Sequence, residues 1–338
     1  MKAITGVAIL GAAILALSVF QISQKPVVGS IDASVKTAFS AWMKKHNISF
    51  KTPIEFNYRL KVFAQSLALV NKHNSEGHTY TIGLNQFSHL TLEEFLVKNT
   101  GLKVPEKQER NEVVLEGTPN QGNVDWRTKG AVNPVKNQGN CGSCWAFSAT
   151  SSIESIWFIS GHTLANLAEQ QLVDCSANWG NQGCNGGWMD YAFKYVIDTK
   201  GQDATANYPY TAQVGTCKSA QYTPVATIKS YNDIPQGNCA QLLTAITNNP
   251  VSVAVAVNSK FQAYTGGVYS DTTCGTGLNH GVTAIGYGTD TQTNLPYWLV
   301  RNSWGASWGE QGYIRMNRNV MPSTGICGIC LAASYPTN

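Results

Sequence analysis

Residues 138–149 read Gln-Gly-Asn-Cys-Gly-Ser-Cys-Trp-Ala-Phe-Ser-Ala, a pattern that places a cysteine at the start of a helix. The run after Cys144 is uncharged apart from Glu154 and ends before Gly161, a residue type common at helix C-termini. Ser143 is a suitable N-cap residue, so we expect Cys144 in the first helical turn. There the positive end of the helix dipole stabilises a thiolate. The stretch therefore predicts a reactive thiol.

Cys141 and Cys144 also form a C-x-x-C pair, which occurs in thioredoxin-like redox sites and in zinc sites. A second pair, Cys327 and Cys330, makes a zinc site an alternative to consider. The two pairs lie far apart in the sequence, and the Gln-Gly before the first pair and the Trp after it serve no metal. We therefore favour a nucleophilic thiol, and we assign no metal ligands and no cofactor.

A nucleophilic thiol needs a base, and the cysteine-bearing part of the chain has two histidines. His162 lies in a polar segment typical of a solvated loop. His280 begins a β-branched run that glycines interrupt, so we expect it at the start of a strand in a curved sheet, which is a rigid mount for a base. Asn302 can accept a hydrogen bond from this imidazole, with Trp304 as an apolar cover.

The composition divides the chain into two parts. Of 338 residues, 43% are hydrophobic and 13% are charged, which suits a globular protein with a sizeable core and argues against disorder. All nine cysteines lie between Cys141 and Cys330. The net charge of +4 comes from residues 1–121, with 13 Lys and Arg against 9 Asp and Glu, whereas the remainder has 11 of each. A neutral larger part argues against nucleic-acid binding.

Residues 3–20 are mainly apolar and follow Lys2, as in a secretory signal peptide. We expect residues 1–18 to be a signal peptide cleaved after Ser18. A retained signal anchor is the alternative, because the apolar run approaches the length of a membrane span. Either predicts a protein of the secretory pathway, in a lysosome or digestive vacuole or secreted, where disulfides persist. Asn47 begins an Asn-Ile-Ser glycosylation sequon, so we expect a glycoprotein.

The segment before the cysteines is predicted to be helical and then extended. Apolar residues recur at helical spacing, namely Leu60, Phe63, Leu67 and Val70. They predict one amphipathic helix, and we expect its buried stripe to pack within its own region. Residues 103–123 are charged and contain prolines and glycines, which is typical of an exposed and cleavable linker.

The chain resembles the papain-like cysteine proteases, and the cathepsin L-type proenzymes in particular. The family signature Cys-Gly-[Ser/Ala]-Cys-[Trp/Tyr] is matched by residues 141–145, and His280 follows Cys144 by 136 positions, within the range of roughly 130 to 150 that the family shows. The similarity continues through residues 184–192 and covers essentially all of residues 124–338.

The resemblance extends to the inhibitory prosegment of that family. The helix motif Glu-x3-Arg-x2-[Val/Ile]-Phe-x2-Asn-x3-Ile-x3-Asn is matched at Glu55, Arg59, Val62, Phe63 and Asn74, with departures at Ser66 and Val70. The following motif, Gly-x-Asn-x-Phe-x-Asp, is matched at Gly83, Asn85 and Phe87, with His89 in place of the aspartate. The resemblance implies a helical prosegment over residues 25–121, whose extended tail fills the substrate cleft, and a mature peptidase domain over residues 122–338.

The implied fold class is α+β, with two lobes and the active-site cleft between them. The left lobe is helical around the Cys144 helix, and the right lobe is β-barrel-like and carries His280 and Asn302. Residues 249–257 fit a strand of the second lobe. The resemblance implies three disulfides, Cys141–Cys184, Cys175–Cys217 and Cys274–Cys327. For Cys239 and Cys330, a fourth disulfide and two buried free thiols are both open.

The resemblance also implies a function, a cysteine endopeptidase made as an inactive precursor and working through a thiolate–imidazolium pair and an acyl-enzyme. Cys144 would be the nucleophile, His280 the general base and acid, and Asn302 the orienting residue, while Gln138 and the Cys144 N–H would form the oxyanion hole. Substrate-binding residues are implied at Gly187, Trp188, Met189, Ala254, Leu278, Ala332 and Trp304. The pocket side chains are apolar, so we expect hydrophobic residues at the second position before the scissile bond.

The implied partners are peptide and protein substrates, the chain's own prosegment as an intramolecular inhibitor, and cystatin-type inhibitors, and we expect a monomer. The alternative is a catalytically silent papain-like binding protein or a prosegment-type protease inhibitor. Silent relatives lose a catalytic residue, whereas Gln138, Cys144, His280 and Asn302 are all present. The enzyme is therefore the favoured prediction.

Overall fold

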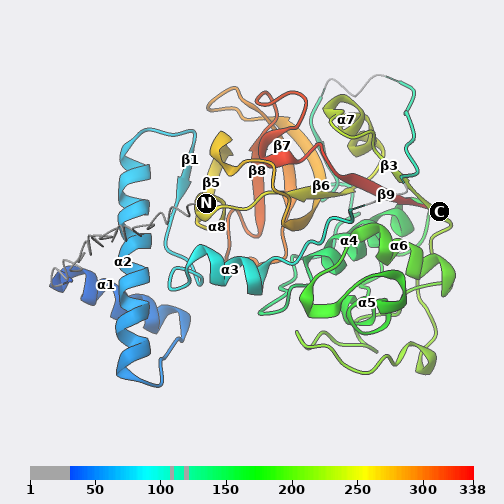
Figure 1. The fold of residues 1–338 in the computed structure, drawn as a ribbon. Helices are drawn as coiled ribbons and strands as arrows, with labels where there is room; N and C mark the ends of the chain where they lie inside the picture. The colour runs from blue at the N-terminus through cyan, green and yellow to red at the C-terminus, as the bar shows by residue number, and fades with distance from the viewer. Residues whose placement is uncertain (1–30, 107–109, 118–121) are drawn as a thin grey trace, which may run out of the picture.

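The computed structural model describes residues 31–106, 110–117 and 122–338. An N-terminal region, residues 31–117, packs beside a larger C-terminal region, residues 122–338 (Figure 1). The signal peptide or anchor expected at residues 1–18 lies outside the described residues. Within those described ranges, no helix is long and apolar enough to cross a bilayer.

The N-terminal region contains α1 (Ala33–His46), α2 (Pro53–Ser75), β1 (Tyr80–Ile82) and α3 (Leu92–Asn99). Phe39 of α1 packs on Phe63 of α2 in a small core that also includes Leu67. Val70, nearer the end of α2, packs against a larger cluster that includes Tyr80 and Ile82 of the same region together with residues of the C-terminal region. The stripe is therefore covered within its own region at Leu60, Phe63 and Leu67, and at Val70 by a cluster that the two regions share.

Helices form one lobe of the C-terminal region and sit below the sheet in Figure 1. They are α4 (Cys144–Ile159), α5 (Glu169–Cys175) and α6 (Met189–Asp198), with short 3-10 turns at Ala177–Trp179, Gly183–Asn185 and Ser219–Gln221. The helices share a buried apolar cluster in which Trp145 of α4 meets Leu172 of α5 and Phe193 of α6. Only residues 156–159 of α4 are partly exposed, because the rest of this helix, whose one charged residue is Glu154, is covered on all sides.

A sheet forms the second lobe. Its strands are β2 (Val124–Asp125), β3 (Ser230–Asp233), β4 (Val251–Val255), β5 (Tyr264–Tyr269), β6 (His280–Thr289), β7 (Pro296–Arg301), β8 (Tyr313–Asn317) and β9 (Ala333–Thr337). Helices α7 (Cys239–Asn248) and α8 (Ser259–Gln262) and 3-10 turns at Thr272–Cys274 and Ile326–Gly328 connect them. The strand order is β1-β5-β8-β7-β6-β4-β9-β3, with β2 paired to β6.

The sheet is not closed, which corrects the expectation of a β-barrel-like lobe. Its terminal strands, β1 and β3, pair with β5 and β9 respectively and not with each other. One terminal strand comes from the N-terminal region, so the two regions share hydrogen bonds of a single sheet. The two-lobe α+β architecture is as expected.

Four disulfides reinforce the C-terminal region. They are Cys141–Cys184, Cys175–Cys217, Cys239–Cys330 and Cys274–Cys327. The first, second and fourth are the pairs that the resemblance implies, and the third resolves the open alternatives for Cys239 and Cys330 in this structure. Cys330 precedes β9 and lies opposite the N-terminus of α7, with Cα atoms 5.2 Å apart. Among the described residues Cys144 is the free cysteine.

Candidate active site

Cys144 occupies the first position of α4, and its thiol is fully buried. The backbone N–H of Gly281 donates a hydrogen bond to Cys144 Sγ, with an N to S distance of 3.3 Å. Ser143 holds the N-cap position as expected, but its hydroxyl does not cap the helix. The Ser143 hydroxyl lies instead 2.7 Å from the hydroxyl of Tyr210, a residue 67 positions further along the chain that the fold brings next to it.

His280 is the first residue of β6, so Gly281, which bonds to the thiol, directly follows it. His280 Nε2 lies 2.8 Å from Asn302 Oδ1. An amide oxygen can only accept, so Nε2 carries the proton and Nδ1 keeps its lone pair. Within the described part of the chain Nδ1 is buried without a hydrogen-bond partner. The Trp304 ring stacks on the imidazole at 4.5 Å between ring centroids, as an apolar cover.

Gln138 is buried beside the start of α4, and other residues fix both ends of its amide. Ser303 Oγ donates to Gln138 Oε1 at 2.7 Å, and Gln138 Nε2 donates to the carbonyl oxygen of Cys141 at 2.9 Å. A second acceptor for Nε2, the carbonyl oxygen of Thr100, lies 3.4 Å away in the N-terminal region. Gln138 can therefore point an N–H at a carbonyl oxygen placed in this site.

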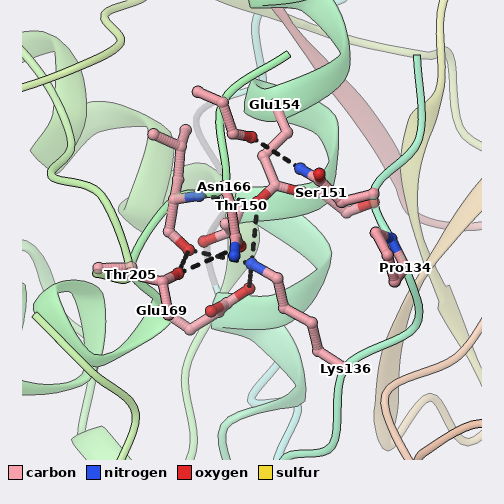
Figure 2. A network of polar contacts seen from close by, with 12 residues as sticks. Pro134, Lys136, Thr150, Ser151, Glu154, Asn166, Glu169 and Thr205 are labelled. Atoms are coloured by element: carbon pink, nitrogen blue, oxygen red, sulfur yellow. Dashed lines mark hydrogen bonds and ion pairs between the residues drawn. The ribbon is translucent and has the colours of Figure 1, made fainter. Parts of the chain in front are cut away.

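A buried charge network holds the loop that carries Gln138 (Figure 2). Lys136 Nζ lies 2.9 Å from Glu154 of α4 and 2.7 Å from Glu169 of α5, and it donates to the carbonyl oxygen of Leu167 at 3.0 Å. The network ties the loop to both helices, and none of the sequence motifs predicts it. A lone charge in an otherwise uncharged helix, Glu154, is the signal that could have indicated a buried partner.

Residues 101–103 of the N-terminal region, shortly after α3, cross this site in an extended conformation. Gly187 N–H donates to the carbonyl oxygen of Gly101, and Lys103 N–H donates to that of Gly187, both at 2.9 Å. The carbonyl oxygen of Asn279 accepts from Gly101 and Leu102 at 3.3 and 3.1 Å. The two hydrogen bonds of Gly187 form a parallel β-bridge between Leu102 and Gly187.

The side chain of Leu102 packs into the apolar cluster of the helical lobe. It is 7% exposed and shares the cluster with Trp188, Met189, Ala254 and Ala332, with Leu278 partly buried against it. These are the expected pocket residues, and the structure places them in one apolar cluster with Leu102. Trp188 also donates its indole N–H to Asp190 Oδ2 at 2.7 Å.

Gly101 allows the chain to come this close. Its φ is +133°, and a Cβ at this position would lie 2.2 Å from the carbonyl oxygen of Gly142. Asn99 adds another contact between the N-terminal region and the site, because Trp304 Nε1 donates to its carbonyl oxygen at 2.7 Å. Trp304 therefore contacts both the imidazole and the chain that fills the cleft.

Burial sets the charge state of the thiol and the imidazole. It raises the pKa of Cys144 to about 12, even though the backbone N–H groups of Cys144 and Trp145 at the helix N-terminus, and that of Gly281 in β6, favour the thiolate. It lowers the pKa of His280 to about 4, against the opposing effect of the hydrogen bond to Asn302. Burial in this state therefore favours the neutral form of both groups.

Two family profiles together account for most of the chain. Residues 120–337 match the papain family cysteine protease profile, and residues 39–95 match the cathepsin propeptide inhibitor domain. Cysteine proteinase RD21A of Arabidopsis thaliana is 42% identical over 316 residues, covering 91% of this chain and 68% of that protein. Senescence-specific cysteine protease SAG39 of Oryza sativa subsp. japonica is 42% identical, covering 91% of this chain and 92% of that protein.

Solved precursors share the whole arrangement. A recombinant stem bromelain precursor superimposes with a TM-score of 0.82 at 40% identity, covering 90% of this chain and 99% of that one. Procathepsin L 3 of the Tenebrio molitor larval midgut gives a TM-score of 0.82 at 38% identity, covering 91% of this chain and all of that one, 100%. This chain therefore belongs to the papain family of cysteine proteases, as a zymogen that carries a cathepsin propeptide inhibitor domain before its peptidase domain.

Proposed function

We propose that the mature enzyme is an endopeptidase in which Cys144 is the nucleophile and His280 the acid and base. The observation that carries this is the meeting of the α4 N-terminus and the start of β6, where Gly281 bonds to Cys144 Sγ and the preceding His280 bonds to Asn302. Asn302 orients the imidazole so that the Nδ1 lone pair is free to take the thiol proton.

Catalysis begins once the prosegment, the N-terminal region described above, leaves and water reaches the site. The Cys144 proton moves to His280 Nδ1, and the thiolate adds to the scissile carbonyl carbon. The resulting oxyanion accepts hydrogen bonds from Gln138 Nε2 and the Cys144 N–H, and one such donor is worth about 3 to 4 kcal/mol. His280 then gives its proton to the leaving amine as the C–N bond breaks. Water hydrolyses the thioester, with His280 taking its proton, and the thiol is regenerated.

The direction of the prosegment explains why it inhibits and is not cut. Its Thr100 carbonyl oxygen lies at Gln138, and its Leu102, later in the chain, fills the apolar pocket. A substrate that puts the residue two positions before the cut into this pocket must run the opposite way. The prosegment therefore occupies the cleft with its peptide bonds reversed with respect to the catalytic groups.

The proposed substrate preference is for hydrophobic residues, such as Leu or Phe, at the second position before the cut. Its support is the burial of Leu102 among Met189, Ala254 and Ala332, none of which offers a charge to a basic side chain. A peptide library read by mass spectrometry tests the preference. Dominant Arg at that position would contradict it.

Two variants test the catalytic roles. Cys144→Ala should abolish peptide hydrolysis, and Cys144→Ser should nearly do so because a hydroxyl does not ionise at this position. His162→Ala, in an exposed loop, is the control and should keep activity. A thiol-directed epoxide should inactivate the processed enzyme with one equivalent. A chain that folds and binds peptides without turning them over would instead support the silent binding protein.

We also propose that the protein acts in the secretory pathway, in a lysosome or digestive vacuole or after secretion, as a monomer that cystatin-type inhibitors recognise. Four disulfides in the described residues support an oxidising compartment. Sensitivity of the expressed protein to an N-glycosidase, lost in Asn47→Gln, would support this route. A cytosolic, unglycosylated product would contradict it.

A further inference from the structure

Three side chains that can bind a metal come together where the prosegment turns from α2 into β1. His73 lies in the last turn of α2, Glu76 caps the end of that helix, and His78 precedes β1. One ligand atom from each residue lies within 4.8 Å of the others. In the parts of the chain that the structure describes, no other three His, Cys, Asp or Glu side chains bring their ligand atoms this close together.

His73 is already arranged as a metal ligand. It is 2% exposed, and its Nε2 lies 3.2 Å from the carbonyl oxygen of Tyr80. That oxygen can only accept, so Nε2 carries the proton and the lone pair resides on Nδ1, which is buried without a hydrogen-bond partner. A metal-bound histidine usually donates its other ring N–H to a carbonyl or carboxylate, which fixes the ring.

The other two ligands are free to adjust. The His78 side chain is 37% exposed and Glu76 is 45% exposed, and they contact each other at 3.0 Å. The rings of His73 and His78 stack in parallel with centroids 4.0 Å apart, so their lone pairs do not yet converge on one point. His78 must turn out of the stack to share an ion with His73, and its exposure makes this rotation inexpensive. Two imidazoles and one carboxylate with an open fourth position suit Zn²⁺.

The surrounding charges permit a cation. Lys72 reaches Glu76 only at 4.0 Å, in an exposed pair of little energetic weight, so it can be displaced. Lys260 of the peptidase domain also acts on His73, and its ammonium group pairs with Asp271 at 3.4 Å. A bound Zn²⁺ would therefore meet one carboxylate and no unpaired ammonium group in this set.

The turn lies directly before the segment that docks the prosegment onto the peptidase sheet. Val268 N–H donates to the carbonyl oxygen of Thr79 at 2.9 Å, and Thr79 Oγ1 donates back to the carbonyl oxygen of Val268 at 2.7 Å. Tyr80 then packs on Tyr269 with ring centroids 4.7 Å apart. An ion that joins the end of α2 to the start of β1 would hold this docking segment in its bound conformation.

We propose that His73 Nδ1, Glu76 and His78 bind a Zn²⁺ ion, and that the ion strengthens the hold of the prosegment on the peptidase domain. The ligands lie on the prosegment, so binding can be measured with catalysis abolished. A failure of the metal site therefore leaves the proposed catalytic roles untouched, and the reverse also holds.

The test uses the full precursor with Cys144→Ala and without a polyhistidine tag, so that neither the thiol nor the tag binds zinc. Titration calorimetry with Zn²⁺ should give one equivalent with a micromolar dissociation constant. Co²⁺ should give the visible absorption of a site with nitrogen and oxygen ligands. His78→Ala and Glu76→Gln change exposed side chains, and each should weaken zinc binding at least tenfold. No binding, or equal affinity in these variants, would overturn the site.

His162→Ala is the matched control, because His162 is exposed and its ring also stacks on an aromatic neighbour, Trp157, at 3.5 Å. It should bind zinc like the parent. Hydrogen exchange of the amides in residues 80–82 tests the second half of the proposal. Zinc should slow this exchange at least threefold in the parent and leave it unchanged in His78→Ala. Unchanged exchange in the zinc-bound parent would overturn the effect on the prosegment.

Discussion

Cys144 and His280 are both fully buried in the zymogen, and burial favours the neutral form of each. Burial raises the pKa of the thiol to about 12 and lowers that of the imidazole to about 4. Forming a thiolate and an imidazolium there requires water or substrate to replace the apolar contacts of the prosegment. Latency is therefore chemical as well as steric, since the covered nucleophile is also protonated.

This state predicts slow alkylation of Cys144 in the precursor. At pH 7 iodoacetamide should modify the precursor roughly a hundredfold or more slowly than the processed enzyme, because only the thiolate reacts. The rate in the precursor should rise as the pH is raised toward the elevated pKa of the thiol. The Cys144→Ala precursor should not be labelled, as the other eight cysteines are in disulfides. Equal rates before and after processing would contradict the prediction.

Asp190 predicts a pH dependence of stability. Burial, and then repulsion from Asp233, raise its pKa to about 7, although Ser334 and Trp188 donate hydrogen bonds to it. An unfolded Asp titrates near 3.9, so between about pH 4 and 7 the folded chain holds more protons. The free energy of unfolding should therefore fall as the pH rises through this window, by up to about 1.4 kcal/mol per pH unit from this group.

Asp190→Asn should remove that contribution, because an amide does not titrate; its oxygen can accept from the Trp188 indole while its N–H donates to the Ser334 hydroxyl. Urea unfolding of the Cys144→Ala precursor at several pH values gives the comparison. Asp198→Asn is the control, since Asp198 accepts from the Trp179 indole at the same 2.7 Å but is exposed. Parallel pH profiles for the parent and Asp190→Asn would show that the buried carboxyl does not titrate as predicted.

The loop carrying Gln138 depends on α4 and α5 through the buried Lys136 network. Lys136→Met should lower the free energy of unfolding by about 3 to 5 kcal/mol, because Glu154 and Glu169 would remain buried without their cation. Lys194→Met, at an exposed position of α6, should change it by about 0.5 kcal/mol or less. Urea denaturation measures both. A loss below about 1 kcal/mol for Lys136→Met would mean that the carboxyls find other partners.

Features encoded locally could be predicted from the sequence, and features that depend on distant contacts could not. Cys144 at a helix start and His280 at a strand start follow from caps and periodicity read within a few residues. The failed capping by Ser143 depends on Tyr210, which is far along the chain. The open sheet and the pairing of β1 with β5 depend on which strands meet in space, and a three-residue strand leaves almost no periodicity to read.

At the scale of the whole molecule, we expect inhibition to depend on a short contact, in which Leu102 packs into the apolar cluster of the helical lobe. Leu102→Ala should reduce the free energy with which the prosegment binds the peptidase domain by about 2 to 5 kcal/mol. The binding equilibrium should then weaken roughly 30-fold or more. The precursor should then hydrolyse a small peptide, or react with iodoacetamide, correspondingly faster while still full length on a gel. Val104→Ala is the control, because Val104 is 44% exposed. An unchanged rate for Leu102→Ala would show that the backbone contacts of Gly101 and Lys103 suffice.

Removal of the prosegment also removes strand β1 from the sheet of the peptidase domain. When the prosegment leaves, β5 loses its neighbour and becomes an edge strand, with free N–H and C=O groups that can template pairing with another chain. Gly267 bends β5 with a φ of +88°, which spoils the flat surface that such pairing needs. The prosegment thus covers an edge that another chain could pair with, and in the mature enzyme the kink at Gly267 should discourage association with its own copies.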